Sequence, residues 1–85
     1  MPITIFQLIT VELPVGAGHD ALPAAFWWHG RRYEIAGYGR RWQDEDESWQ
    51  HLLAQTRAGD TVELRRHGQT GEWQLARAWW QDAAV

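Results

Sequence analysis

The chain has 85 residues, a net charge of −3 and no cysteine. This length predicts one domain, residues 1–85, with a thin core, because so small a chain buries only about 60% of its extended surface. Seven tryptophans offset that deficit, since each large aromatic side chain can bury about 150–250 Å². The missing cysteines exclude disulfides and thiolate chemistry. The negative charge gives no general electrostatic attraction to nucleic acid.

The first predicted strand runs from Ile3 to Leu13. Its β-branched residues favour a pleated surface, and apolar side chains occur at both parities, with Phe6 and Leu8 opposite the isoleucines. No basic, uninterrupted apolar leader is visible at this end, so we expect a cytoplasmic protein. The prolines and glycines of Pro14–Pro23 then predict a loop.

A tight hairpin is predicted over Phe26–Ile35, with His29-Gly30 as its turn, because glycine accepts the positive φ that short hairpin turns require. Side chains alternate along strands, and opposed residues share a face. Four residues are therefore expected on the core face: Phe26, Trp28, Tyr33 and Ile35. Trp27, Arg32 and Tyr38 are expected on the opposite face.

The sequence pattern does not settle the secondary structure of the stretch after the hairpin. Gly37-Tyr38-Gly39 predicts a bend or bulge, and the acidic run Asp44–Glu47 follows. An acidic run suits a helix N-terminus, and the apolar spacing of 48–56 fits a helix. The same residues fit a strand that buries Leu52 and Ala54 on one face. Both a short helix near 45–55 and a strand remain open on this pattern.

Two more strands complete the chain. Thr61–Arg66 alternates clearly, His67–Gly71 is a turn, and Glu72–Trp80 reads as the last strand. Short strands between turn signals predict an all-β fold. Five to six antiparallel strands would form a small, partly open barrel of SH3-like or OB-like size.

Several spaced residues carry a resemblance. The pattern is Trp28-x-Gly30-Arg31-x-Tyr33-x-Ile35, then Trp42, Gly59-x-x-Val62-x-Leu64 and Trp73-x-Leu75-x-Arg77-x-Trp79. It resembles an uncharacterised bacterial family of small Trp- and Arg-rich domains, which also occur at the C-terminal end of Y-family polymerase-like proteins of mutagenesis cassettes. The resemblance covers roughly Phe26 to Trp80. It implies a strand over Gln50–Thr56 and no catalytic residues.

Known catalytic and metal-binding patterns are missing from the sequence. Ser48 is the single serine and lies outside any Gly-x-Ser-x-Gly elbow. The histidines lack metal-ligand spacing, and Asp44–Glu47 lacks the pattern of a calcium loop. We therefore expect no enzyme activity, no metal and no cofactor.

The clearest functional signal is a basic and aromatic segment, Ala24–Trp42. It carries four arginines and one acidic residue. Such a segment suits a protein interface, stacking on single-stranded nucleic acid, or arginines that cover a thin core. The residues expected to contact a partner are Trp27, Arg32, Tyr38, Arg40 and Arg41.

The sequence thus predicts a non-catalytic interaction module whose partner is another protein. The resemblance adds a setting in DNA repair or damage tolerance. One alternative is a single-stranded nucleic-acid-binding domain. Another is a homo-oligomer whose apolar first strand pairs across subunits. A monomer or a homodimer is expected.

Overall fold

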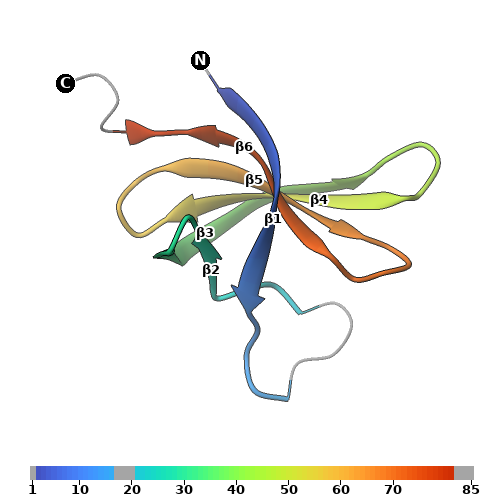
Figure 1. Cartoon of the computed structure of the whole chain (residues 1–85), viewed down its shortest axis with the longest axis horizontal. Coiled ribbons are helices and arrows are strands. Elements are labelled where there is room, and N and C mark those ends of the chain that lie inside the picture. Colours follow the sequence, from blue (N-terminus) through green and yellow to red (C-terminus); the bar gives the residue numbers. More distant parts are fainter. Residues whose placement is uncertain (1, 17–20, 82–85) are drawn as a thin grey trace.

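The computed structural model describes residues 2–16 and 21–81, and it confirms the all-β prediction (Figure 1). The middle of the predicted Pro14–Pro23 loop, with His19, and the residues after Gln81 lie outside the described ranges. The strands are β1 (Ile3–Glu12), β2 (Ala25–Trp28), β3 (Arg31–Gln43), β4 (Trp49–Thr56), β5 (Thr61–His67) and β6 (Trp73–Trp79). In these ranges no helical segment has the length and apolar character needed to cross a bilayer.

The six strands form a closed antiparallel barrel in which each strand neighbours the next in the chain. Closure depends on β1, which lies across the front of the barrel in Figure 1. It pairs with β6 from Ile3 to Ile9 and with β2 from Thr10 to Glu12. The barrel is therefore closed, where the sequence predicted a partly open one.

The β2–β3 hairpin has the predicted turn and register. His29 and Gly30 have φ angles of 51° and 75°, the left-handed conformations that a two-residue turn requires. Phe26 pairs with Tyr33, and Trp27 pairs with Arg32. Phe26 is fully buried and Trp27 is 42% exposed, so the predicted inner and outer faces of this hairpin are confirmed.

Residues 49–56 form a strand, and the helix alternative is wrong. β4 pairs with β3 on one side and with β5 on the other, so both neighbours satisfy its backbone groups. Leu52, Ala54 and Thr56 are buried. Leu52 and Ala54 belong to a core that contains the fully buried Phe26, Val62, Leu64 and Leu75.

β3 does not end at the predicted bend but continues to Gln43, with two register shifts. One lies between Ile35 and Gly37, the other between Tyr38 and Arg41. Each inserts an extra residue, which reverses the alternation of faces. Tyr38 consequently pairs with Ala54 on the inner face, and the prediction that it shares a face with Trp27 is wrong.

We expect Gly30→Ala to lower the free energy of unfolding by about 1 kcal/mol, since an alanine at positive φ is strained. A Cβ at Gly30 would meet no atom within 4 Å, so the loss would come from the backbone alone. Urea unfolding measures it. Gly37→Ala is the matched control, because Gly37 has equal space and no positive φ. Equal losses in both variants would contradict the turn geometry.

Candidate functional site

The five residues predicted to contact a partner do not form one surface. Trp27 and Arg32 lie together on the outer face of the hairpin. Arg40 lies over the ring of Trp42. Tyr38 and Arg41 lie on the inner face of β3, where it extends beyond β2. The hydroxyl of Tyr38 donates a hydrogen bond to the Pro23 carbonyl at 2.7 Å.

Trp27 and Arg32 are held by Glu12 of the neighbouring β1. Trp27 Nε1 donates to Glu12 Oε2 at 2.7 Å, while Arg32 donates from Nε to Oε2 at 2.8 Å and from Nη2 to Oε1 at 3.0 Å. These hydrogen bonds, first from Arg32 and then from Trp27, hold the pKa of Glu12 below its ordinary value. The bond to Glu12 likewise raises the pKa of Arg32. The indole and guanidinium are thus fixed in position on the surface.

A second outer-face cluster surrounds His51, which is 9% exposed. Its ring stacks on Trp42 with centroids 5.0 Å apart. Nε2 lies 2.7 Å from Asp44 Oδ1, and Nδ1 lies 3.1 Å from Glu63 Oε2. Glu63 Oε1 is 3.7 Å from Arg77 Nε. Each ring nitrogen of His51 therefore has a carboxylate oxygen within hydrogen-bond distance.

This cluster leaves His51 without a free nitrogen for a substrate or an ion. The two carboxylates lie against different nitrogens of the ring and do not converge on a common point. Within residues 2–16 and 21–81, no three His, Asp or Glu side chains are placed to hold a metal. In the same acidic turn, Ser48 donates to Asp46 through its hydroxyl and its amide, which lowers the pKa of Asp46.

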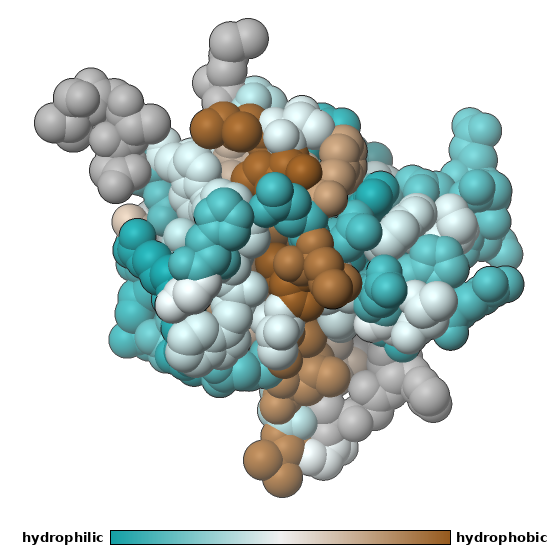
Figure 2. Space-filling view, in the orientation of Figure 1, coloured by the Kyte–Doolittle hydropathy of each residue, from teal (hydrophilic) through white to brown (hydrophobic). Residues whose placement is uncertain are grey.

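The outer face of β1 carries exposed apolar side chains that are not among the five predicted contact residues. Leu8 is 66% exposed and Phe6 is 46% exposed. The Arg65 guanidinium lies between two rings, 4.5 Å from the centroid of Phe6 and 3.9 Å from that of Trp49. In Figure 2 hydrophobic side chains form a continuous stripe along this side of the molecule. Beyond the end of β1, Leu13 and Val15 are also exposed.

Trp27 extends this surface, because it pairs with Thr10, two residues beyond Leu8 on the same face of β1. We define the outer band as Phe6, Leu8 and Trp27, with Arg32 and Arg65 beside them. The sequence contained one signal for it, the apolar residues at the second parity of the first strand. Their exposure depends on which face of β1 the barrel encloses.

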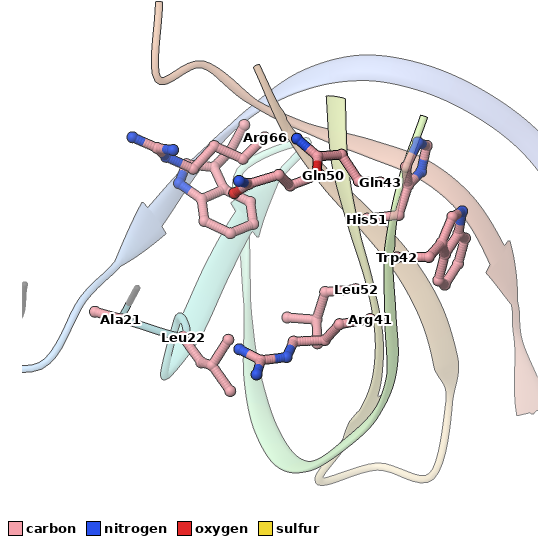
Figure 3. Close-up of a pocket in the computed structure, with 10 residues that line it drawn as sticks. Ala21, Leu22, Arg41, Trp42, Gln43, Gln50, His51, Leu52 and Arg66 are labelled. Carbon is pink, nitrogen blue, oxygen red and sulfur yellow. The ribbon is translucent and has the colours of Figure 1, made fainter. Parts of the chain in front are cut away.

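A pocket of about 480 Å³ lies on the inner side of β3, near one end of the barrel (Figure 3). It contains only one of the five predicted residues, Arg41. The residues that line it come from the segment before β2 and from four strands: Ala21, Leu22, Arg41, Trp42, Gln43, Gln50, His51, Leu52, Arg66 and Trp73. Figure 3 shows Arg41 and Arg66 on opposite sides of the pocket.

The fold and these surfaces define a small antiparallel β-barrel with an exposed apolar band and a separate cationic pocket. The sequence profile of a domain of unknown function, DUF6504, matches residues 3–84, and the chain belongs to this family. The membership agrees with the resemblance to an uncharacterised family of small domains. No curated protein and no solved structure matches the chain.

The neighbours Trp27 and Trp28 should differ in their contribution to stability. Trp28 stacks on Trp80 and His29 and donates from Nε1 to Gln7 at 2.9 Å. Trp28→Ala should lower the free energy of unfolding by about 3 kcal/mol. Trp27→Ala should lower it by about 1 kcal/mol, since its ring is exposed. Thermal and urea unfolding test the contrast, and equal losses would refute the assignment of Trp27 to the surface.

Glu12 should make stability depend on pH. Its pKa is lower in the folded than in the unfolded state, so its contribution is present above the ordinary carboxyl pKa and is lost as pH falls through the lowered value. Arg32→Gln should raise the pKa of Glu12 toward the ordinary value and weaken this acid dependence. Side-chain carboxyl NMR titration measures it.

The matched control is Arg57→Gln. Arg57 pairs with a different surface carboxylate, Glu34, at 3.2 Å. This variant should leave the titration of Glu12 unchanged. A Glu12 titration that is insensitive to Arg32→Gln would show that the bidentate contact does not persist in solution.

Proposed function

We propose that this domain is a non-catalytic interaction module that binds another protein through the outer band. The observation that supports the proposal is the exposure of Phe6, Leu8 and Trp27 on one face. Contiguous exposed apolar side chains mark contact surfaces. Tryptophan and arginine are also the residue types that contribute most to protein interfaces. Arg32 and Arg65 are held in place by Glu12, Gln74 and the aromatic rings, so little side-chain entropy is lost on binding.

The same contacts favour a protein over single-stranded nucleic acid as the partner. Bases stack on free aromatic faces, but Arg65 already covers the facing sides of Phe6 and Trp49. Trp42 is stacked on His51, and Trp28 on Trp80. Within the described residues, Trp27 is the outer-band ring without an aromatic or cation–π contact, whereas Phe6 is covered by Arg65. The net charge of −3 adds no attraction for a polyanion.

A second candidate is a homo-oligomer. Only Thr10–Glu12 of β1 pairs with β2, so the Ile3–Leu8 stretch has a strand neighbour on one side only within the part of the chain that the structure describes. An unpaired strand edge can pair with a second copy. This observation supports a homodimer that forms through β1.

The cellular setting is proposed from the resemblance alone. Similar small domains occur at the end of polymerase-like proteins of mutagenesis cassettes, which supports a role in DNA repair or damage tolerance in the bacterial cytoplasm. This is an analogy at the level of the family. It identifies where a partner should be sought and does not identify the partner.

Site-specific photo-crosslinking in the native host tests the proposal, with and without DNA damage. A photoreactive phenylalanine analogue at Leu8 should crosslink one defined protein. The same analogue at Gln55, which is exposed on the outer side of β4, should not. With the purified partner, Trp27→Ala should weaken binding about 30-fold, equivalent to about 2 kcal/mol.

Leu8→Arg should abolish the interaction, while Gln55→Arg adds the same charge elsewhere and should leave it intact. A crosslinked product of twice the 9.9 kDa chain would support the homodimer instead. Crosslinks to nucleic acid, with an affinity that falls steeply with salt, would support the nucleic-acid alternative. Equal crosslinking from positions 8 and 55 would contradict any role of the outer band.

A further inference from the structure

The inner face of the barrel changes character at one end. The strand register aligns Gln43, Gln50, Arg66 and Trp73 in a single row across β3, β4, β5 and β6. The next row inward is Arg41, Leu52, Leu64 and Leu75. Inner-face positions of a small barrel normally carry apolar side chains that fill it. Here Arg41, Gln43 and Gln50 are exposed, so this end of the inner face opens to solvent.

The two arginines of this pocket have no counter-charge within the described residues. Within the described residues, three of the eight arginines, Arg32, Arg57 and Arg77, each form an ion pair with a glutamate. Arg41 and Arg66 form no ion pair and no side-chain hydrogen bond in the described ranges, and no acidic side chain is among those that line the pocket. A pocket with two unpaired guanidinium groups therefore lies inside a domain whose net charge is negative. Two planar guanidinium groups in one pocket can bind an anion.

The other residues that line the pocket indicate the chemical character of a ligand that carries an anionic group. Leu22 and Leu52 offer apolar surface, and Trp73 has no aromatic partner among the described residues, unlike Trp28, Trp42 and Trp49. The amides of Gln43 and Gln50 can both donate and accept hydrogen bonds, as a peptide backbone requires. Figure 3 shows Gln50 near Arg66, with Arg41 extending toward Leu22 across the pocket.

We propose that this pocket binds a carboxylate-bearing peptide segment in which an apolar side chain adjoins the carboxylate. Planar guanidinium groups bind carboxylates through two parallel hydrogen bonds. The apolar side chain would contact Trp73 and Leu22, and the volume of about 480 Å³ lies in the usual range of about 300–1,000 Å³ for ligand pockets. The occupant is a protein segment because the proposed function is protein binding, but the pocket is separate from the outer band.

A single carboxylate fits the surroundings better than a phosphodiester chain. The acidic turn that joins β3 to β4 begins immediately after Gln43, and its Glu45 and Glu47 are exposed. A long polyanion that leaves the pocket in this direction would meet like charges, whereas a short peptide carries its charge only between the arginines. The electrostatics therefore favour a peptide over nucleic acid.

NMR titration of the whole domain tests the proposal with defined probes. These are acetyl-Gly-Leu with a free carboxylate, its neutral amide, acetyl-Gly-Leu-Asp-amide and the mononucleotide dTMP. A free-acid or aspartate peptide should bind with a millimolar dissociation constant. It should shift the signals of Arg41, Arg66, Gln50 and the Trp73 indole. The dissociation constant of the neutral amide should be at least about 10-fold higher. The two acidic peptides distinguish a chain terminus from an internal side chain.

Arg41→Gln and Arg66→Gln should each weaken binding of the acidic peptide by about 10-fold to 100-fold. The matched control is Arg57→Gln, since Arg57 is an exposed arginine that pairs with Glu34 and does not line the pocket. It should bind as the parent does. Asp20 precedes Ala21 in the sequence, and Asp20→Asn shows whether a carboxylate of the chain itself competes with the peptide. Thermal unfolding checks that each variant is folded.

Equal binding of the acid and amide peptides, or no shifts with either at about 10 mM, would overturn the proposal. Tighter binding of dTMP than of both acidic peptides would overturn it in favour of a nucleotide. These outcomes are independent of the crosslinks at Leu8. The pocket proposal can therefore fail while a partner still binds the outer band, and the reverse combination is equally distinguishable.

Discussion

The exchange of partners along β3 is the constraint on which the rest of the structure depends. Its first residues pair with β2 and the remainder with β4, so one thirteen-residue strand belongs to both sides of the barrel. A strand can bend this far when extra residues interrupt its pairing, and the two register shifts after Ile35 and Tyr38 supply them. With β3 bent, β2 reaches the end of β1, and the pairing of β1 with β6 closes the barrel.

The same bend decides which side chains enter the barrel. Phe26, Val62, Leu64 and Leu75 fill the middle, where all neighbouring strands contribute apolar residues. Beyond the end of β2, β3 pairs with β4 alone, and the polar side chains of Arg41 and Gln43 on its inner face are exposed. The core is therefore short, and the pocket is the part of the barrel interior that it does not fill.

The outer face compensates for this small core with pairs of planar groups. Trp42 lies on His51, and Arg65 lies between Phe6 and Trp49. Carboxylate oxygens of Asp44 and Glu63 lie within hydrogen-bond distance of the two ring nitrogens of His51. Several aromatic and charged residues that suggested a binding function in the sequence thus form stabilising contacts within the domain. Two candidate binding surfaces remain: the outer band on one face and the pocket at one end of the barrel.

The sequence by itself determined the features that depend on neighbouring residues. Alternation along the strands and the glycine of the His29-Gly30 turn are local properties, so the all-β class, the hairpin and the faces of Phe26 and Trp27 could be predicted. Residues 49–56 fitted a helix and a strand equally well, and only pairing with β3 and β5 decided between them. The register shifts that moved Tyr38 to the inner face also depend on the partner strand. The pocket and the outer band needed the tertiary structure, because closure of the barrel brings together side chains from strands far apart in the chain.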